Sequence, residues 1–240
     1  MGMSRARDLD RFYEVLARLQ SKLGGCRCLG GCGGRGGEGW RWPSQGVYFF
    51  FEPGEMREDG RTPRVVRVGT HAVSEGSKTT LWQRLSRHKG YERGKYAGGG
   101  NHRGSVFRLH VGTALLATGD YPQEVRSTWG KGASAGPLTR ELEHPLECQV
   151  SAYIRRMPFL WVAVPGPAGT SSPRSIIESN AVALLSNRHK PPIDPPSPNW
   201  LGLYAQRAEI RESGLWNVNY VDQPYDPAFI ELLDSFVAAM

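Results

Sequence analysis

Two short apolar segments, followed directly by a helical one, constrain the fold of this chain most. Residues 46–52 (GVYFFFE) form a continuous apolar run that is too short for a stable helix and rich in aromatic side chains. Residues 64–70 are rich in β-branched side chains, and an acidic stretch containing Gly and Pro separates the two runs. The pattern predicts two central strands, with Pro53-Gly54 ending the first and a long hairpin loop over 53–63.

The segment after the second strand changes to helical spacing. Residues 77–89 begin with Ser77 and Thr79 as candidate N-caps, and a basic last turn precedes the glycine stop at Gly90. Arg84 and His88 lie one turn apart on the same stripe as the apolar residues of this helix. A charged group on such a stripe is costly unless it is paired or opens into a cleft. The structural alternative is a buried ion pair and a histidine favourably placed at a helix C-terminus.

Later segments predict a third strand of a small sheet and the helices that pack against this sheet. Residues 157–164 (MPFLWVAV) predict a third buried strand, and Ser172 as N-cap with Pro173 at the first helical position predicts a helix to Leu185. Further helices are predicted over 8–23, 105–118, 144–156 and 226–239. The fold class is therefore α/β (α+β), with a small central three-stranded, mainly antiparallel sheet flanked by helices.

At 240 residues the chain can bury one substantial core, so we expect one domain with additions. Residues 1–45 would form an N-terminal helix and a loop rich in Gly and Cys. Residues 46–190 would form the core, with an insertion at about 90–156. Residues 191–240 would form a C-terminal extension that packs on the core.

Basic charge is concentrated in the first part of the chain. Residues 1–110 hold 20 Lys and Arg against 10 Asp and Glu, whereas residues 111–240 hold 10 against 13. This asymmetry favours a surface that faces phosphates, and a merely solvated basic surface is the alternative. No apolar run approaches the roughly 18 residues of a membrane span, and the N-terminus lacks the apolar region of a signal peptide. We therefore expect a cytoplasmic protein without a membrane part.

Cysteine spacing leaves a metal site open. Cys26, Cys28 and Cys32 lack the paired C-x2-C arrangement of a structural zinc site. Cys148 or a histidine could complete four ligands, but reduced thiols in a loop are the favoured interpretation.

Further polar side chains point inward from the predicted strands and helices. Tyr48 lies in an apolar strand, Arg67 interrupts a β-branched strand, and Glu178 shares a helix face with apolar residues. Each has a structural explanation, such as a buried tyrosine with one hydroxyl partner or a glutamate near a helix N-terminus. Together with Arg84 and His88 on one small sheet, they indicate a functional site.

These residues resemble the motifs of the GIY-YIG nuclease family. Gly46-Val47-Tyr48 is similar to the first motif, and Arg67-Val68-Gly69 to the second, with arginine where the family usually has tyrosine. The resemblance covers roughly residues 45–70, 79–89 and 157–188. It implies a GIY-YIG-like fold, a phosphodiester substrate and a single divalent metal.

The resemblance also implies roles for the later residues. Arg84 corresponds to the family arginine, and His88 is similar to a histidine of restriction endonucleases with this fold. Glu178 looks like the metal-binding glutamate, and Asn187 like the asparagine that follows it, with Asn199 as a competitor.

In the implied chemistry, Glu178 holds Mg²⁺ or Mn²⁺ through hard oxygen ligands. The metal and Arg84 stabilise charge on the phosphate, and Tyr48 orients or deprotonates the attacking water. His88 assists proton transfer or binds phosphate, and Arg67 contributes another phosphate contact.

Basic residues outside the small core are expected to contact DNA. They are Lys78, His102, Arg103 and Arg108, the last three close to backbone-permissive glycines of the insertion. A solvated basic loop is the alternative for the insertion residues.

The sequence therefore predicts a divalent-metal-dependent DNA endonuclease, with restriction or defence as the expected setting. A palindromic target would require a homodimer. The alternative is a catalytically inactive nucleic-acid-binding protein that keeps the fold, and Arg67 is its best argument. A third option is a structural protein whose inward charges form ion pairs.

Overall fold

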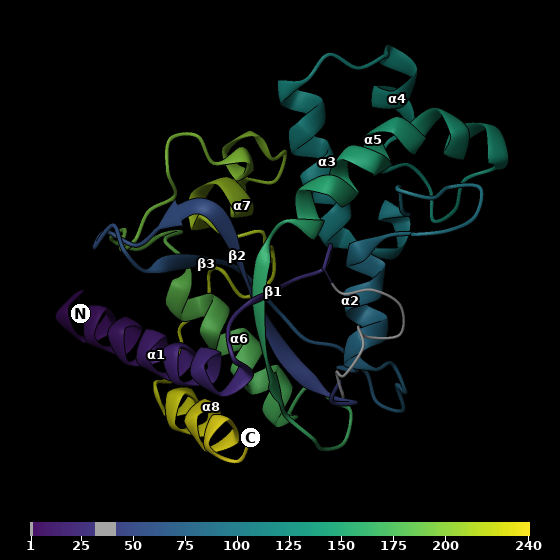
Figure 1. The fold of residues 1–240 in the computed structure, drawn as a ribbon. Coiled ribbons are helices and arrows are strands. Elements are labelled where there is room, and N and C mark those ends of the chain that lie inside the picture. Colours follow the sequence, from purple (N-terminus) through teal and green to yellow (C-terminus); the bar gives the residue numbers. More distant parts are fainter. Residues whose placement is uncertain (1, 32–41) are drawn as a thin grey trace.

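The computed structural model describes residues 2–31 and 42–240 of the chain (Figure 1). Within these residues, four antiparallel strands form one sheet in the order β1-β4-β2-β3. The strands are β1 (Arg27–Cys28), β2 (Gly46–Met56), β3 (Pro63–Gly69) and β4 (Pro158–Ala163). The three predicted strands are present, and the two-residue β1 extends the sheet beyond β4. The fold is the mixed α/β class predicted from the sequence.

β2 is longer than predicted because Pro53-Gly54 does not end it. The pairing of β2 with β3 shifts register after Phe51 and resumes where Met56 faces Pro63. Pro53 and Gly54 are exposed within this irregular stretch, where a missing backbone N–H interrupts no ladder bond. The hairpin loop is therefore only residues 57–62.

Three helices cover one face of the sheet: α1 (Gly2–Leu23), α6 (Pro173–Leu185) and α8 (Ala228–Ala238). Figure 1 shows α1 and α8, from opposite ends of the chain, side by side on this face. The ring centroid of Phe12 lies 5.8 Å from that of Phe49 on β2 and 6.1 Å from that of Phe229 on α8. Both flanking segments of the chain therefore contribute to the main core.

The opposite face carries Tyr48 and His88 of the site predicted from the sequence, whereas Glu178 belongs to α6. This face is covered by α2 (Leu81–Lys89), α3 (Val106–Thr118), α5 (Pro137–Arg155) and residues of the C-terminal extension. Tyr48 and Phe50 point to this face, whereas Val47 and Phe49 point to the other, as strand alternation predicts. The insertion also contains the 3₁₀ helix η1 (His102–Gly104) and α4 (Gln123–Thr128), and it projects away from the sheet (Figure 1).

Helix ends agree with the predicted positions in part. Ser172 caps α6 as predicted. α2 begins later than expected, because Thr80 rather than Ser77 or Thr79 is its N-cap and forms a capping box with Gln83. α5 begins at Pro137, well before the predicted residue 144.

The C-terminal extension covers the outer edge of β3. It contains η2 (Leu201–Tyr204) and α7 (Ala208–Ser213). The Trp216 N–H donates to the Val66 carbonyl at 2.7 Å, and the Asn217 amide both accepts from the Val68 N–H and donates to its carbonyl, at 3.1 and 2.8 Å. These bonds occupy backbone groups of β3 that would otherwise form an open edge.

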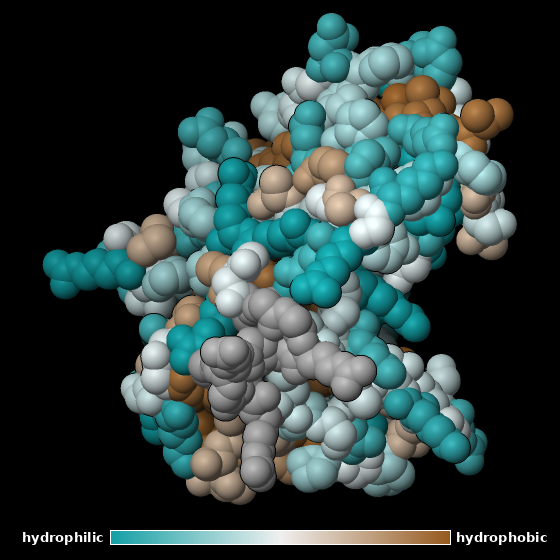
Figure 2. All heavy atoms as spheres, turned by 45° about the vertical axis from the view of Figure 1, so that its right-hand side comes forward, coloured by the Kyte–Doolittle hydropathy of each residue, from teal (hydrophilic) through white to brown (hydrophobic). Residues whose placement is uncertain are grey.

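The surface seen in Figure 2 is mainly hydrophilic, with apolar side chains in small separate patches. In the part of the chain that the structure describes, none of the helices has the length and apolar character needed to cross a membrane.

Candidate active site

Close packing explains the glycines of both strand motifs. Tyr48 faces Gly69 across the β2–β3 pair, and a Cβ added to Gly69 would lie 2.3 Å from Cζ and Oη of Tyr48. A Cβ on Gly46 would lie 2.4 Å from the Val162 carbonyl oxygen on β4. Neither position accepts a side chain without movement of its neighbours, so the Tyr48 ring lies directly over the Gly69 backbone.

A buried hydrogen-bond chain begins at the Tyr48 hydroxyl. Tyr48 Oη lies 2.9 Å from His88 Nε2, and His88 Nδ1 lies 2.8 Å from Ser105 Oγ. Tyr48 and His88 are fully buried, and Ser105 is 2% exposed. Burial, reinforced by the charges of nearby arginines, holds the pKa of His88 well below its usual value. His88 is therefore neutral at pH 7.

Two arginines lie beside the Tyr48 hydroxyl. Arg67 donates from Nη1 to the Trp216 carbonyl at 2.7 Å, and its guanidinium carbon lies 4.6 Å from the centre of the Phe107 ring. Burial lowers the pKa of Arg67, whereas the neighbouring Tyr48 raises the pKa of Arg84. The Nε atoms of both arginines are buried without a hydrogen-bond partner among the described residues. Both guanidinium groups therefore keep donor capacity inside the site.

Glu178 completes the group from α6. Its Oε1 accepts the Thr70 N–H at 3.2 Å, and the charges of Arg67 and Arg84 act on its carboxylate. Burial raises the pKa of Glu178, and the two arginines and the Thr70 N–H oppose this effect. Glu178 as a whole residue is half-buried, at the end of β3 beside the two arginines.

A single carboxylate fits a divalent metal that is shared with the substrate. Among the described residues, no cluster of three or more His, Cys, Asp or Glu side chains is arranged to hold a metal. Mg²⁺ commonly binds one or two carboxylates and takes its other ligands from water and substrate phosphates. Glu178 can supply such a hard oxygen ligand, so the residues fit this kind of metal.

The structure gathers most, but not all, of the predicted catalytic residues. Those that lie together are Tyr48, Arg67, Arg84, His88 and Glu178. Asn187 lies elsewhere, because its Oδ1 accepts from Arg5 Nη2 at 3.0 Å and from the Ile193 N–H at 2.9 Å. This amide fastens the turn after α6 to α1 and makes no contact with the tyrosine group.

The predicted DNA contacts in the insertion need correction, because they hold the insertion together. His102 is 2% exposed and donates its backbone N–H to Glu147, which also contacts His102 Nδ1 at 2.9 Å. Arg108 is fully buried and forms an ion pair with the same carboxylate. Both side chains are therefore occupied by the Glu147 carboxylate inside the insertion.

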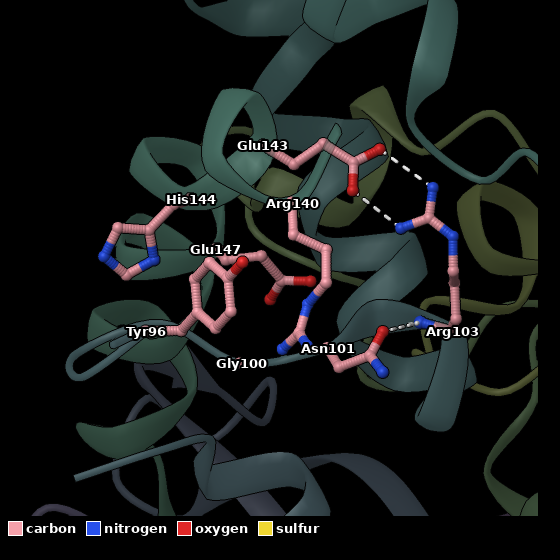
Figure 3. Close-up of a pocket in the computed structure, with 8 residues that line it drawn as sticks. All are labelled: Tyr96, Gly100, Asn101, Arg103, Arg140, Glu143, His144 and Glu147. Atoms are coloured by element: carbon pink, nitrogen blue, oxygen red, sulfur yellow. Dashed lines mark hydrogen bonds and ion pairs between the residues drawn. The ribbon is translucent and has the colours of Figure 1, made fainter. Parts of the chain in front are cut away.

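Arg103 is likewise paired. Its Nη1 and Nη2 donate to the two carboxylate oxygens of Glu143 at 2.6 and 2.9 Å (Figure 3). Its side chain is 6% exposed, and Arg103 also donates to backbone carbonyls of Thr128 and Lys131. Lys78 differs, since it is exposed in the loop that leads to α2. It is the one predicted DNA contact left at the surface among the described residues.

The cysteine question is answered only in part. Cys26 and Cys148 are free thiols of intermediate burial, and Cys28 Sγ lies 3.4 Å from the Arg156 carbonyl oxygen. Cys32 lies outside the described residues, so the structure tests neither the reduced thiols expected for this loop nor the metal site that the spacing left open.

His71 and Ser105 are site-supporting residues that sequence reasoning missed. His71 Nε2 accepts the Gly46 N–H at 3.2 Å, and its Nδ1 donates to the Thr79 carbonyl at 2.6 Å. It thereby ties the first motif to the residue before the α2 cap. Ser105 was recognisable as a helix N-cap, but its contact with His88 depends on tertiary packing.

Comparison with known proteins identifies the family of the chain. No curated protein and no solved structure gives a significant match to the chain. The family model of the GIY-YIG domain matches residues 3–240, which include the N-terminal helix, the insertion and the C-terminal extension. Members of this family are typically nucleases that act on nucleic acid with the help of a divalent metal. The chain belongs to the GIY-YIG domain family.

Proposed function

We propose that this protein is a divalent-metal-dependent DNA endonuclease that hydrolyses phosphodiester bonds. The observation that carries this proposal is the buried Tyr48–His88 hydrogen bond, flanked by Arg67 and Arg84 and close to the carboxylate of Glu178. The group combines a proton acceptor, two fixed positive charges and a metal ligand. These are the components that phosphodiester hydrolysis requires.

In the proposed mechanism, neutral His88 accepts the Tyr48 hydroxyl proton at Nε2. The Tyr48 oxygen then takes a proton from water as the water attacks phosphorus. The bond between phosphorus and the leaving sugar oxygen breaks, and that oxygen takes its proton from solvent. Arg67 and Arg84 stabilise negative charge on the tyrosine oxygen and on the non-bridging phosphate oxygens. Glu178 would hold Mg²⁺ or Mn²⁺, which when bound supplies Lewis-acid stabilisation of the phosphate charge.

A nucleic-acid-binding protein without catalytic activity is the second candidate. Arg67 stands in place of the second-motif tyrosine, and part of its donor capacity is used by the Trp216 carbonyl. A site that had kept the fold for binding alone would retain the positive charge and lose the hydrolytic step. The Tyr48–His88 bond favours the catalytic reading, since binding alone does not require a buried proton relay.

Plasmid nicking separates these functions. Supercoiled plasmid is incubated with wild type, Glu178→Ala and the matched control Glu124→Gln, an exposed carboxylate on α4, in Mg²⁺ or Mn²⁺. The proposal predicts cleavage by wild type and Glu124→Gln and a loss of about 100-fold or more in Glu178→Ala, with salt-sensitive DNA binding retained. Equal inactivity of all three proteins, with DNA binding intact, would favour the second candidate.

The expected restriction setting adds two measurements. Cleavage at one sequence, mapped by end sequencing, would support it. A palindromic site would further require a two-fold dimer, which light scattering detects in the presence of DNA.

A further inference from the structure

The insertion reaches the proposed catalytic group through Ser105, the residue that caps α3. We propose that Ser105 is a positioning residue, whose Oγ fixes the neutral His88 tautomer in which Nε2 faces Tyr48 as a hydrogen-bond acceptor. This inference deepens the proposed function and rests on it for its effect on cleavage. Its structural part is independent of activity, because a tautomer can be measured in a protein that cleaves nothing.

The partners of the Tyr48 oxygen determine the direction of its hydrogen bond. The guanidinium groups of Arg67 and Arg84 lie beside this oxygen, and a guanidinium can donate but not accept. His88 Nε2, at 2.9 Å, is the acceptor found at this hydroxyl among the described residues. The Tyr48 O–H therefore donates to Nε2, which must carry no proton.

The remaining ring proton then has one position. Burial and the surrounding arginine charges hold the pKa of His88 well below its usual value, so the ring is neutral and carries a single N–H. Because Nε2 is an acceptor, that proton lies on Nδ1. Ser105 Oγ, 2.8 Å from Nδ1, accepts it.

Ser105 is itself held in place by the insertion. Its Oγ also accepts the Arg108 N–H at 3.3 Å, which is the N-cap bond of α3. Arg108 Nη1 donates to the His88 carbonyl at 2.8 Å, and the same guanidinium is fixed by Glu147 on α5. The hydroxyl is therefore oriented by a helix start that is packed against the end of α2. The insertion belongs to the catalytic site on this account, in addition to any part in target selection.

The direct test is the tautomeric state of His88. Long-range ¹H–¹⁵N correlation spectra of the full-length chain at pH 7.5 report which ring nitrogen carries the proton, with His88→Gln used to assign the signals. Wild type should show a protonated Nδ1 and an unprotonated Nε2. Ser105→Ala should show a mixture of tautomers or the opposite one, and Ser105→Thr should restore the wild-type pattern.

Thr80→Ala is the control for the loss of a helix N-cap as such. It removes the N-cap of α2 and leaves Ser105 intact. Both Ala variants should melt at lower temperature, but only Ser105→Ala should change the His88 tautomer. Single-turnover cleavage should fall about tenfold or more in Ser105→Ala, because general acid–base assistance contributes about 10²–10⁴-fold.

A protonated Nε2 in wild type would overturn the proposal without any variant. An unchanged tautomer in Ser105→Ala would also overturn it. If the NMR results agree but no protein cleaves DNA, the positioning role stands and the endonuclease proposal fails. The two failures are therefore distinguishable.

Discussion

Gly69→Ala should disrupt both stability and the catalytic group, because the new methyl collides with Tyr48. The added Cβ would lie 2.3 Å from the ring carbon Cζ and from the hydroxyl oxygen, and the ring is fully buried. The tyrosine cannot turn into solvent, so either β3 or the ring must shift. Overpacking of this kind costs about 1–3 kcal/mol. We expect the free energy of unfolding to fall by about 2 kcal/mol, which lowers the Tm of a domain this size by about 4–8 °C.

The same displacement should break the 2.9 Å bond between Tyr48 and His88. Because positioned acid–base groups contribute about 10²–10⁴-fold, single-turnover nicking of supercoiled plasmid at 25 °C should fall about 100-fold. Thermal unfolding monitored by circular dichroism is the control, and each variant should be folded at the assay temperature.

Two other glycines provide matched controls. Gly46→Ala places its Cβ 2.4 Å from a β4 carbonyl oxygen, so it should destabilise the sheet comparably without touching the Tyr48 ring. Gly136→Ala meets nothing within 4 Å and should change neither property. A Gly69→Ala protein with wild-type Tm and wild-type nicking would refute the packing argument. Equal loss of nicking in Gly46→Ala and Gly69→Ala would show that general destabilisation explains the effect.

Two further predictions concern buried charge. Burial, with a smaller effect of nearby arginine charges, lowers the pKa of His110 from its usual 6.5 to about 4, so its contribution to stability is complete above pH 6.5 and is lost as the pH falls toward 4. The shift from 6.5 to about 4 corresponds to about 3 kcal/mol in the free energy of unfolding. His110→Gln should therefore make the free energy of unfolding, measured by urea titration, depend less on pH between pH 7 and 4. The same pH dependence in wild type and His110→Gln would contradict this prediction. Glu147→Ala leaves the fully buried Arg108 without its carboxylate and should lower the free energy of unfolding by about 3–5 kcal/mol. Arg11→Ala breaks a solvent-exposed pair with Glu231 and should have a much smaller effect. Urea unfolding of both variants measures the contrast, and similar costs would show that burial does not govern these pairs.

Residues on periodic elements were the ones that sequence reasoning placed well. Helical spacing put Arg84 and His88 on the inward stripe of α2, and strand alternation put Tyr48 and Phe50 on one face, which α2 covers in the structure. These predictions needed only local geometry, since a period of 2 or 3.6 fixes the direction of each side chain. The same reasoning directed Glu178 inward from α6, where its carboxylate meets the Thr70 N–H.

The insertion was misread because its partners are distant in sequence. Arg103 and Arg108 were expected to contact DNA beside glycines of the insertion, yet their carboxylate partners, Glu143 and Glu147, lie about 40 residues later on α5. No local pattern connects such residues. His102, Arg103 and Arg108 are therefore paired with carboxylates inside the insertion.

Loop residues were missed for a related reason. His71 and Ser105 lie in or beside irregular segments, where no periodicity indicates the direction of a side chain. Asn187 was assigned from the family resemblance alone. In the structure its Oδ1 accepts hydrogen bonds from Arg5 on α1 and from the Ile193 N–H in the turn after α6.

The Tyr48 hydroxyl takes part in phosphodiester hydrolysis in the proposed mechanism, so the removal of that one oxygen should abolish most of the cleavage. Single-turnover cleavage of supercoiled plasmid in Mg²⁺ is compared for wild type, Tyr48→Phe and the control Tyr204→Phe. Tyr204 lies on η2 and is 53% exposed. We expect the cleavage rate to fall about 100-fold or more in Tyr48→Phe and to stay at the wild-type value in Tyr204→Phe. The DNA affinity of both variants should be unchanged. Wild-type cleavage by Tyr48→Phe would contradict the proposed mechanism.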